Sequence, residues 1–257
     1  MRIESLQNPR VKRLVALQQK RRERTKHGLF VVEGEREISR ALTCEYDIVE
    51  LWMMDEFDVP INLDESMVIR CSPAVFQKIS YRGEAAKYLA VFKMKEMSFD
   101  SLKLPKTALI ITLENIEKPG NLGAVLRSAN AFGADAVVVC DSSVDIYNPN
   151  VIRNSLGGFF DLPIVVSTSE QAISFFQKNN VQMVTTHLEA SMNYLDVDYT
   201  RSTALIMGAE STGLSNLWVK NTNQNVIIKM GGVVDSLNIS VAAAVVMSEV
   251  ARQRAHL

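Results

Sequence analysis

Six short runs of valine, isoleucine and leucine recur along the second half of the chain and constrain its fold more than any other feature. They lie at residues 108–113, 136–140, 162–166, 181–186, 204–208 and 226–230. Segments of helical character separate these runs. Near-continuous apolar strands that alternate with helices are typical of a parallel sheet covered on both faces. We therefore predict an α/β domain over residues 107–257.

The first 95 residues predict a second, smaller α/β unit. Strands are expected at 28–34, 47–54, 66–71 and 88–94, and helices at 9–26, 35–42 and 72–79. Ser72 followed by Pro73 is a typical helix start. Residues 96–106 have the composition of a linker. The expected organisation is thus 1–95, a linker at 96–106, and 107–257.

A formal net charge of −1 hides a basic N-terminal arm. Residues 1–28 carry nine arginines and lysines against two glutamates, or +7, which leaves −8 for the rest of the chain. Basic arms attract phosphate backbones, so Arg10, Lys12 and Arg22 are candidate RNA contacts. A solvated helix surface stays open as an alternative. A mitochondrial presequence is a weaker one, because the segment is poor in serine and runs directly into the first domain.

The cysteines and the hydropathy indicate in which cellular compartment the protein is expected. Cys44, Cys71 and Cys140 lack the spacing of metal ligands and are interpreted as small core residues of a protein in a reducing cytoplasm. No apolar run approaches the roughly 20 residues that span a bilayer. We expect a cytoplasmic protein with no membrane segment and no metal site.

Three segments of the second half share one form, in which a strand runs through a glycine-containing loop into a helix. They are 107–133, 202–220 and 226–254. Glycine allows positive φ and lets a ligand come close to the backbone. Three such loops in one half of a chain predict one composite site.

In the first loop, Asn121 is expected to cap a helix that ends at Gly133. Arg127 lies one turn after Gly123 and is expected to lean over it towards the head of the helix. In the second loop, Glu210 is expected either to hold Arg127 or to cap the next helix.

The third loop adds Ser236 and Asn238. None of these residues forms a nucleophile–base pair of the hydrolase type. The chain also lacks GxGxxG after its first strand and GxxxxGK[ST], which disfavours dinucleotide and P-loop sites.

Three motifs of the second half resemble, in order and spacing, those of the SpoU (TrmH-like) branch of the SPOUT RNA methyltransferases. They are PGNLGAVLRSANAFGADAVVV, IMGAESTGLS and IKMGGVVDSLNISVAAAV. The resemblance covers about residues 107–255. Residues 1–95, with FVVEGEREISRAL, resemble the ribosomal-protein-type substrate-binding domain of the rRNA members. The chain departs from the family at two positions: Lys229 stands where many members have proline, and Asp235 stands where several have a small residue.

This resemblance implies a deep trefoil knot, which is an exception to the usual absence of knots, and S-adenosylmethionine-dependent methylation of a ribose 2′-hydroxyl. The implied catalytic residues are Asn121, Arg127, Glu210, Ser236 and Asn238. The implied cofactor residues are Gly208, Ile228 and Leu237, with Thr186, Met207 and Met230 lining the pocket. Arg153 and Ser155 are implied near the RNA, and no metal is required.

Arginine hardly ever deprotonates in proteins. We therefore expect Arg127 to orient the nucleophile and stabilise developing charge rather than to act as a base. The added N-terminal domain favours large-subunit rRNA over tRNA as substrate. The alternatives are a tRNA ribose methyltransferase and a non-catalytic RNA-binding factor. A nicotinamide-dependent oxidoreductase is disfavoured by the missing glycine fingerprint. The sequence leaves open which nucleotide is modified, and whether the role is housekeeping or antibiotic resistance.

Residues 239–247 are apolar nearly all the way round a helix. A helix that covers one face of a sheet should present a polar side to water. We therefore expect this helix to pack against its own sheet and against a second surface. The resemblance implies a homodimer through the C-terminal helix, with Ala243 and Val246 at the expected contact.

Overall fold

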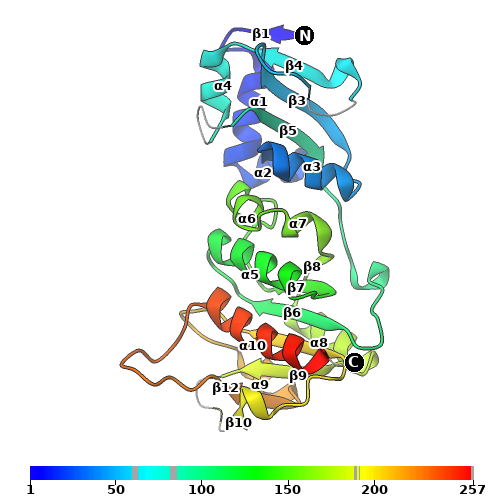
Figure 1. The fold of residues 1–257 in the computed structure, drawn as a ribbon, viewed down its shortest axis with the longest axis vertical. Coiled ribbons are helices and arrows are strands. Elements are labelled where there is room, and N and C mark those ends of the chain that lie inside the picture. The colour runs from blue at the N-terminus through cyan, green and yellow to red at the C-terminus, as the bar shows by residue number, and fades with distance from the viewer. Residues whose placement is uncertain (60–62, 82–85, 188–189, 191, 256–257) are drawn as a thin grey trace. The chain divides into compact units, whose positions relative to one another are not determined.

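A computed structural model describes residues 1–59, 63–81, 86–187, 190 and 192–255 (Figure 1). The chain forms two compact units. The N-terminal unit comprises Met1–Lys95 and Asp145–Phe160, and the C-terminal unit comprises Glu96–Val144 and Asp161–Leu257.

The N-terminal unit contains a five-stranded mixed sheet in the order β1-β4-β3-β5-β2. Its elements are β1 (Arg2–Ile3), α1 (Pro9–Gln19), α2 (Arg21–His27), β2 (Leu29–Glu33), α3 (Glu35–Thr43), β3 (Ile48–Met54), η1 (Glu65–Met67), β4 (Val68–Cys71), α4 (Pro73–Ile79), β5 (Tyr88–Lys93), α6 (Pro149–Asn154) and α7 (Gly158–Asp161). The four predicted strands are confirmed, and Ser72 caps α4 by accepting from the Val75 N–H.

The helix predicted over 9–26 is two helices, because Lys20 is extended at φ −122° and ψ 114°. Of the four apolar side chains expected on the buried side of this segment, Val11, Leu14 and Leu17 are buried, whereas Val15 is only half-buried. Arg24, one of the nine basic residues of the arm, is also buried. Its guanidinium lies 2.6 Å from the Asp145 carboxylate and so is not available to phosphate.

The segment Asp145–Phe160 lies within the region predicted as the second domain, yet the structure groups it with the N-terminal unit. Aromatic packing provides the physical reason. The ring of Phe30 lies 4.7 Å from that of Tyr147 and 6.2 Å from that of Phe159. The buried Arg24–Asp145 ion pair adds a polar tie.

The C-terminal unit contains a seven-stranded sheet in the order β10-β12-β9-β11-β6-β7-β8, with every pairing parallel. Its elements are η3 (Phe99–Ser101), β6 (Leu109–Glu114), α5 (Pro119–Ala131), β7 (Ala136–Cys140), β8 (Ile164–Ser167), α8 (Ser169–Lys178), β9 (Gln182–Thr186), β10 (Met192–Asn193), η4 (Tyr194–Asp196), β11 (Thr203–Met207), α9 (Asn216–Asn221), β12 (Gln224–Ile227) and α10 (Ile239–Arg254). The predicted parallel α/β sheet is confirmed. The trefoil knot stays a prediction.

Both faces of this sheet are covered, as its apolar strands require. On one face, Ile110, Val138 and Ile206 pack with Phe176 of α8 and Trp218 of α9. On the other face, α5 and α10 pack against each other and lie together over the strands (Figure 1). This two-sided burial explains why the strands read as continuous apolar runs.

Strand register brings the carboxyl ends of the central strands level with one another. Met207 at the end of β11 pairs with Leu113 of β6, and the next β6 residue, Glu114, pairs with Cys140 of β7. The loops that leave these strands therefore emerge at one edge of the sheet. Ligands bind at this edge in open α/β sheets.

The segment predicted as a linker packs onto the C-terminal unit. Met97, Phe99, Leu102 and Leu104 contact its core, and the Phe99 ring stacks on Phe175 at 4.4 Å. Spacing in the sequence does not reveal such contacts, because a polar, loop-like segment can still contribute every second or third side chain to a core.

Cys71 and Cys140 are buried core residues as predicted, and burial raises the pKa of each thiol to about 12. Both are therefore neutral packing groups. Cys44 is half-buried. Across the described ranges, no helix combines the length and apolarity that a membrane crossing needs.

Candidate active site

Glu210 lies at the centre of a hydrogen-bonded cluster at the carboxyl edge of the seven-stranded sheet. Its Oε1 accepts from Asn121 Nδ2 at 2.8 Å, and its Oε2 lies 2.8 Å from Lys118 Nζ. Lys118 precedes α5 and Asn121 lies in the first turn of that helix. The cluster thus joins the first and second predicted loops.

The third loop joins the same carboxylate through Asn238. Its Nδ2 donates to Glu210 Oε1 at 2.6 Å, and its Oδ1 caps α10 by accepting from the Ser240 N–H. The backbone N–H of Ile239 also donates to Glu210. Three segments distant in the sequence therefore converge on one carboxylate, as the composite-site prediction required.

The donors around Glu210 determine its charge state. Hydrogen bonding from Lys118 is the main cause that lowers the pKa of the Glu210 carboxyl, and burial opposes it. The Lys118 charge, Ile239 N–H and Asn121 lower it further. An ionised carboxylate with both oxygens occupied is suited to holding loops together rather than to abstracting a proton.

Glycine is required at position 208 for a structural reason that the sequence did not reveal. A Cβ at this position would lie 2.2 Å from the carbonyl carbon of Gly213, so only glycine lets the loop close on itself. Ala209 and Gly213 form the bridge that follows. The expected close approach at Gly208 is thus made by the protein's own backbone.

Glu114 anchors the same loop from beneath. Its carboxylate is buried and accepts from the Ser215 N–H at 2.7 Å. The Ser169 hydroxyl lies 3.4 Å from the other oxygen and receives the Trp218 indole N–H at 2.8 Å. At the surface, Ser211 donates to Glu117 at 2.6 Å. The Glu210 loop is therefore tied to the β6–α5 connection by several side chains.

Arg127 does not pair with Glu210, which corrects one of the two roles considered for that glutamate. Arg127 is exposed, and within the described ranges its side chain makes no hydrogen bond or ion pair. It lies six positions after Asn121, which is about 9 Å along the helix axis. Lys118 is closer to the loop and takes the position expected for the arginine.

Asn121 does not cap α5, which corrects a second expectation. The helix begins at Pro119 with Lys118 at the capping position, so Asn121 lies inside it with its side chain free to reach Glu210. The predicted end holds, because Gly133 follows the helix at φ +70°.

The predicted strand over 226–230 is shifted, because β12 ends at Ile227. Residues 228–237 have no regular structure and project as the orange segment of Figure 1. Within the part of the chain that is described, their backbone groups make no hydrogen bond to other backbone groups. Val233 and Val234 are exposed, whereas Ile228, Met230 and Leu237 are half-buried.

The other predicted site residues lie near this edge in different settings. Ser236 is exposed, and its hydroxyl donates to Asp235 at 3.1 Å rather than to the Glu210 cluster. Thr186 ends β9, with its hydroxyl 3.5 Å from the Ile206 carbonyl of β11. Met207 ends β11 and is buried.

The predicted RNA residues belong to the N-terminal unit. Arg10, Lys12 and Arg22 are exposed. The Arg153 guanidinium lies over the ring of Tyr81. Ser155 is 1% exposed and donates to the Ile152 carbonyl. That burial argues against a direct contact between the Ser155 hydroxyl and RNA.

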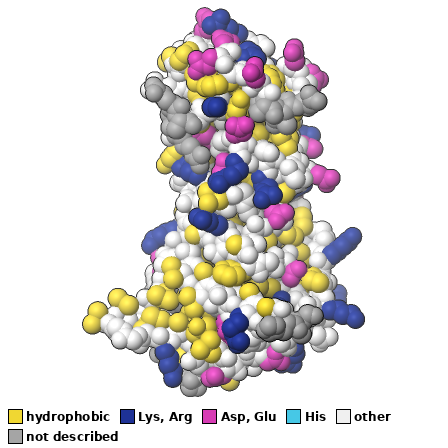
Figure 2. Space-filling view, viewed as in Figure 1, with side chains coloured by type: hydrophobic (Ala, Val, Ile, Leu, Met, Phe, Trp, Pro, Cys, Tyr) yellow, Lys and Arg dark blue, Asp and Glu magenta, His cyan; other side chains and the backbone are white. Residues whose placement is uncertain are grey.

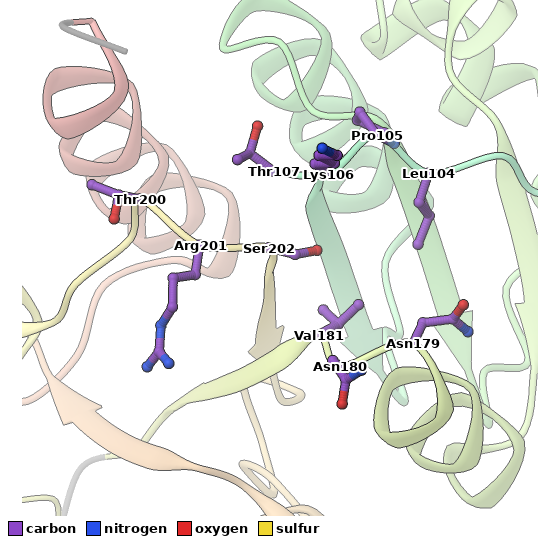
Figure 3. Close-up of a pocket in the computed structure, with 10 residues that line it drawn as sticks. All are labelled: Leu104, Pro105, Lys106, Thr107, Asn179, Asn180, Val181, Thr200, Arg201 and Ser202. Atoms are coloured by element: carbon purple, nitrogen blue, oxygen red, sulfur yellow. The ribbon is translucent and has the colours of Figure 1, made fainter.

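A cavity of about 470 Å³ lies at the opposite, amino edge of the same sheet (Figure 3). Lys106 and Thr107 precede β6, Val181 precedes β9 and Ser202 precedes β11. This cavity shares no residue with the Glu210 cluster and does not form part of the candidate site.

The apolar helix α10 is buried on one side only. Ala243 and Val246 are fully buried within their own chain. On the outward side, Val241 is 47% exposed, and Ala244 and Val245 are half-buried. Apolar side chains also cover the projecting segment and the surface beside it (Figure 2, yellow).

Two residues of the site, Lys118 and Glu114, are not among those predicted from the sequence. Lys118 directly precedes the first quoted motif, which begins at Pro119, so a cation at the mouth of the first loop was visible. Its partner, Glu210, could not be identified from the sequence, because pairing between loops depends on the order of the strands in the sheet. Glu114 gave a weaker signal, as the single carboxylate at the end of an apolar strand.

The comparisons with known proteins agree with this geometry. Residues 108–248 match the SpoU rRNA methylase family, and residues 8–90 match the MRM3-like substrate-binding domain. The chain belongs to the SpoU rRNA methylase family, which confirms the resemblance stated from the three motifs.

Full-length relatives give the particular proteins that this chain is similar to. It is 30% identical to the 23S rRNA (guanosine(2553)-2′-O)-methyltransferase RlmP of Bacillus subtilis, over 95% of this chain and 97% of that one. It is 36% identical to a solved RNA 2′-O ribose methyltransferase, with a TM-score of 0.86 over 99% and 100% of the two chains. The SpoU methyltransferase AviRb of Streptomyces viridochromogenes, solved with AdoMet, is 27% identical with a TM-score of 0.87 over 97% and 99%.

Proposed function

We propose that this protein transfers a methyl group from S-adenosylmethionine to a ribose 2′-hydroxyl of RNA, with large-subunit rRNA as the substrate. The observation that carries the proposal is the convergence of Lys118, Asn121 and Asn238 on Glu210. It unites the three family motifs at the edge of the sheet where ligands bind. Family membership and the rRNA-modifying relatives support the substrate class.

The residues at this edge fit a nucleoside-type cofactor. Ile228, Met230 and Leu237 offer half-buried apolar side chains beside a backbone that makes no backbone hydrogen bonds within the described ranges. Such a segment can hold an adenine and its sugar through main-chain groups and apolar contact. Thr186, Met207 and the Gly208 loop would complete the pocket. S-adenosylmethionine supplies an activated methyl group on a sulfonium centre.

We assign Glu210 the role of an organiser. Its ionised carboxylate fixes Asn238 and the start of α10 relative to α5. In this way it sets the positions of the loops that would hold the two reactants. Holding reacting groups in line can supply much of the rate of a transfer reaction.

Arg127 is the exposed cation assigned to the RNA hydroxyl. Arginine side chains stay protonated in proteins, so Arg127 would orient the 2′-oxygen and stabilise the negative charge that develops on it. Its freedom from carboxylates within the described chain leaves the guanidinium available for that contact. Ser236 is also exposed and would hydrogen-bond to the substrate.

The test is methylation of protein-free 23S rRNA, mapped by mass spectrometry of ribose 2′-O-methyl groups. Arg127→Ala is expected to abolish methylation while the affinity for S-adenosylhomocysteine, measured by calorimetry, stays within a few-fold. Arg127→Lys retains the charge without the planar fork and tests whether charge alone suffices. The control is Arg201→Ala, an exposed cation at the amino edge of the sheet. An active Arg127→Ala enzyme would exclude Arg127 from the mechanism.

We propose further that the N-terminal unit binds the RNA through Arg10, Lys12 and Arg22. Deleting residues 1–95 would leave the aromatic side chains of Asp145–Phe160 without their partners, so point substitutions test this better. Changing all three residues to glutamine should make the plot of log K for RNA binding against log salt concentration less steep. The slope should change by about 0.7–0.9 for each phosphate contact that is lost. Arg2→Gln is the control, since Arg2 already pairs with Asp55.

We propose finally that two copies pair through the outward side of α10. Val241 and Val245 are the positions to test, because charge at the buried Ala243 or Val246 would unfold the chain instead. Light scattering should give twice the mass of one chain for the native protein and a lower mass for Val241→Glu. Leu195→Glu, at a similarly exposed residue outside α10, is the control. A fully active monomer would refute the pairing.

A further inference from the structure

Tyr81 is an exposed aromatic side chain on a surface that the proposed chemistry does not use. It is 66% exposed, and it is the one aromatic among the large exposed apolar side chains of the described chain. Its backbone is held in place, since the Tyr81 N–H donates to Glu33 Oε2 at 3.0 Å and the Ser80 hydroxyl donates to Glu33 Oε1 at 2.7 Å. An exposed ring on an anchored backbone is a prepared contact surface.

Arg153 covers one face of this ring. The central carbon of its guanidinium lies 3.6 Å from the ring centroid of Tyr81, which is a stacking distance. Arg153 reaches this position from the short helix α6, where Asn150 Oδ1 accepts from its Nη1 at 3.3 Å. With Arg153 in this position, Tyr81 is still 66% exposed.

A second arginine, Arg40 of α3, packs against the turn that follows Arg153. Gly157 has φ +99°, and a Cβ at this position would lie 3.3 Å from Cγ of Arg40. The stem of Arg40 thus packs over the glycine, while the residue as a whole stays exposed. Among the residues that the structure describes, neither Arg40 nor Arg153 forms an ion pair with a carboxylate.

We propose that Tyr81 is a stacking platform for an unpaired base of the RNA, and that Arg153 and Arg40 hold the adjoining phosphates. The proposal rests on RNA being the substrate and adds where an unstacked base would bind. Proteins recognise single-stranded RNA by stacking its bases on aromatic rings and arginine planes. An exposed ring under Arg153, with Arg40 packed against the following turn and neither arginine paired with a carboxylate of the described residues, fits a nucleotide better than an apolar protein partner.

The proposal is tested by binding of the full chain to a short single-stranded RNA that carries 2-aminopurine, compared with an RNA duplex of equal length. Stacking on aromatic side chains tolerates different base sequences, so an arbitrary sequence serves as the probe. Tyr81→Ala should weaken single-strand binding about 5- to 100-fold and reduce the change in 2-aminopurine fluorescence. Duplex binding should stay unchanged.

Three variants separate stacking from folding and from charge. Tyr81→Phe keeps the ring and should bind within about twofold of the native protein. Arg153→Ala should weaken binding and lower its salt slope, whereas Arg153→Lys should restore the slope without the full affinity. Leu6→Ala removes an exposed apolar side chain elsewhere in the same unit and should have no effect. Thermal unfolding followed by circular dichroism reports whether each variant is folded.

The outcomes distinguish this proposal from the proposed function. A Tyr81→Ala protein that binds the single strand as tightly as the native chain overturns the stacking site, while rRNA methylation can still stand. An equal loss on single strand and duplex also overturns it, because stacking cannot act on paired bases. A native protein that binds no RNA would overturn both.

Discussion

The loop 208–215 and the segment 228–238 frame the same edge of the sheet but are held in opposite ways. The first is fastened by Glu114, Glu117, Lys118 and Asn121 through four side-chain connections. The second makes no backbone–backbone hydrogen bonds up to residue 237 within the described ranges and exposes two valines. A rigid polar frame thus faces an open apolar segment. This division suits a site that must keep its catalytic geometry while admitting a large ligand.

The strongest test of this contrast compares glycines from the two regions. Gly208→Ala places a Cβ 2.2 Å from the backbone of Gly213, so the loop cannot keep its closure. We expect methylation to fall about 100-fold or more, since small misplacements of catalytic groups can have effects of that size. Gly232→Ala is the control, because its Cβ would meet nothing within 4 Å and its φ is not positive. Equal melting temperatures and activities for the two variants would show that the loop 208–215 and the segment 228–238 do not differ in how tightly they are held.

The next test replaces the central carboxylate. Glu210→Gln keeps the shape of the side chain but removes its charge. It also replaces one carboxylate oxygen by an NH₂ group, which cannot accept the hydrogen bonds that this oxygen accepted. Hydrogen bonds to charged groups contribute about 1.5–3 kcal/mol, so the rate should fall about 10- to 100-fold. Glu117→Gln, in the same connection but bonded to the exposed Ser211, should change the rate little. Single-turnover rates at saturating cofactor measure the difference.

A smaller effect is expected from the partner cation. Lys118 is the main cause of the lowered pKa of Glu210, so Lys118→Met should let that pKa rise towards its ordinary value. The ionised carboxylate acts at neutral pH and is lost as the pH falls through its pKa in the folded protein. The acid limb of the rate–pH profile should therefore move to higher pH in this variant. Lys178→Met, an exposed lysine of α8, should leave the limb in place.

The smallest change is expected in the stability of a variant of the open segment. Val233→Ala alters a side chain that makes no packing contribution, so the free energy of unfolding should change by less than about 0.5 kcal/mol. Leu214→Ala, in the fastened loop, removes a side chain that belongs to the core cluster. It should lower the free energy of unfolding by about 2–5 kcal/mol. Urea titration of both variants shows whether the open segment is as independent of the fold as its exposure indicates.

Pattern and motif together predicted most of the fold. The apolar runs located β6 and β7 within one residue, because a buried strand must be apolar throughout its length. The Gly133 signal located the C-terminal end of α5, since backbone conformation there is a local property, whereas the predicted cap at Asn121 placed the start three residues too late. The motifs also predicted that Asn121, Glu210 and Asn238 belong to one site.

The pairing within that site could not be predicted. Glu210 was expected to hold Arg127 or to cap the helix that follows its loop, and it binds Lys118 instead, while that helix, α9, has no side-chain cap. The choice depends on how far each cation lies along α5 from the 208–215 loop, and that distance exists only once β6 and β11 pair. Gly208 is a different case, because the backbone it approaches, that of Gly213, belongs to the same loop. The need for glycine there comes from the way this loop closes on itself, and the spacing of the two glycines does not by itself reveal that closure.

The sequence by itself determined the α/β class, the three loops and the family, because these depend on local periodicity and on residues at fixed spacing. Only the tertiary structure decided that Arg24 is buried against Asp145, that Asp145–Phe160 joins the N-terminal unit, and that α10 hides Ala243 while exposing Val241. Each of these depends on which surfaces come into contact across long sequence separations. Local propensity carries no information on such contacts, because they arise from the packing of whole elements.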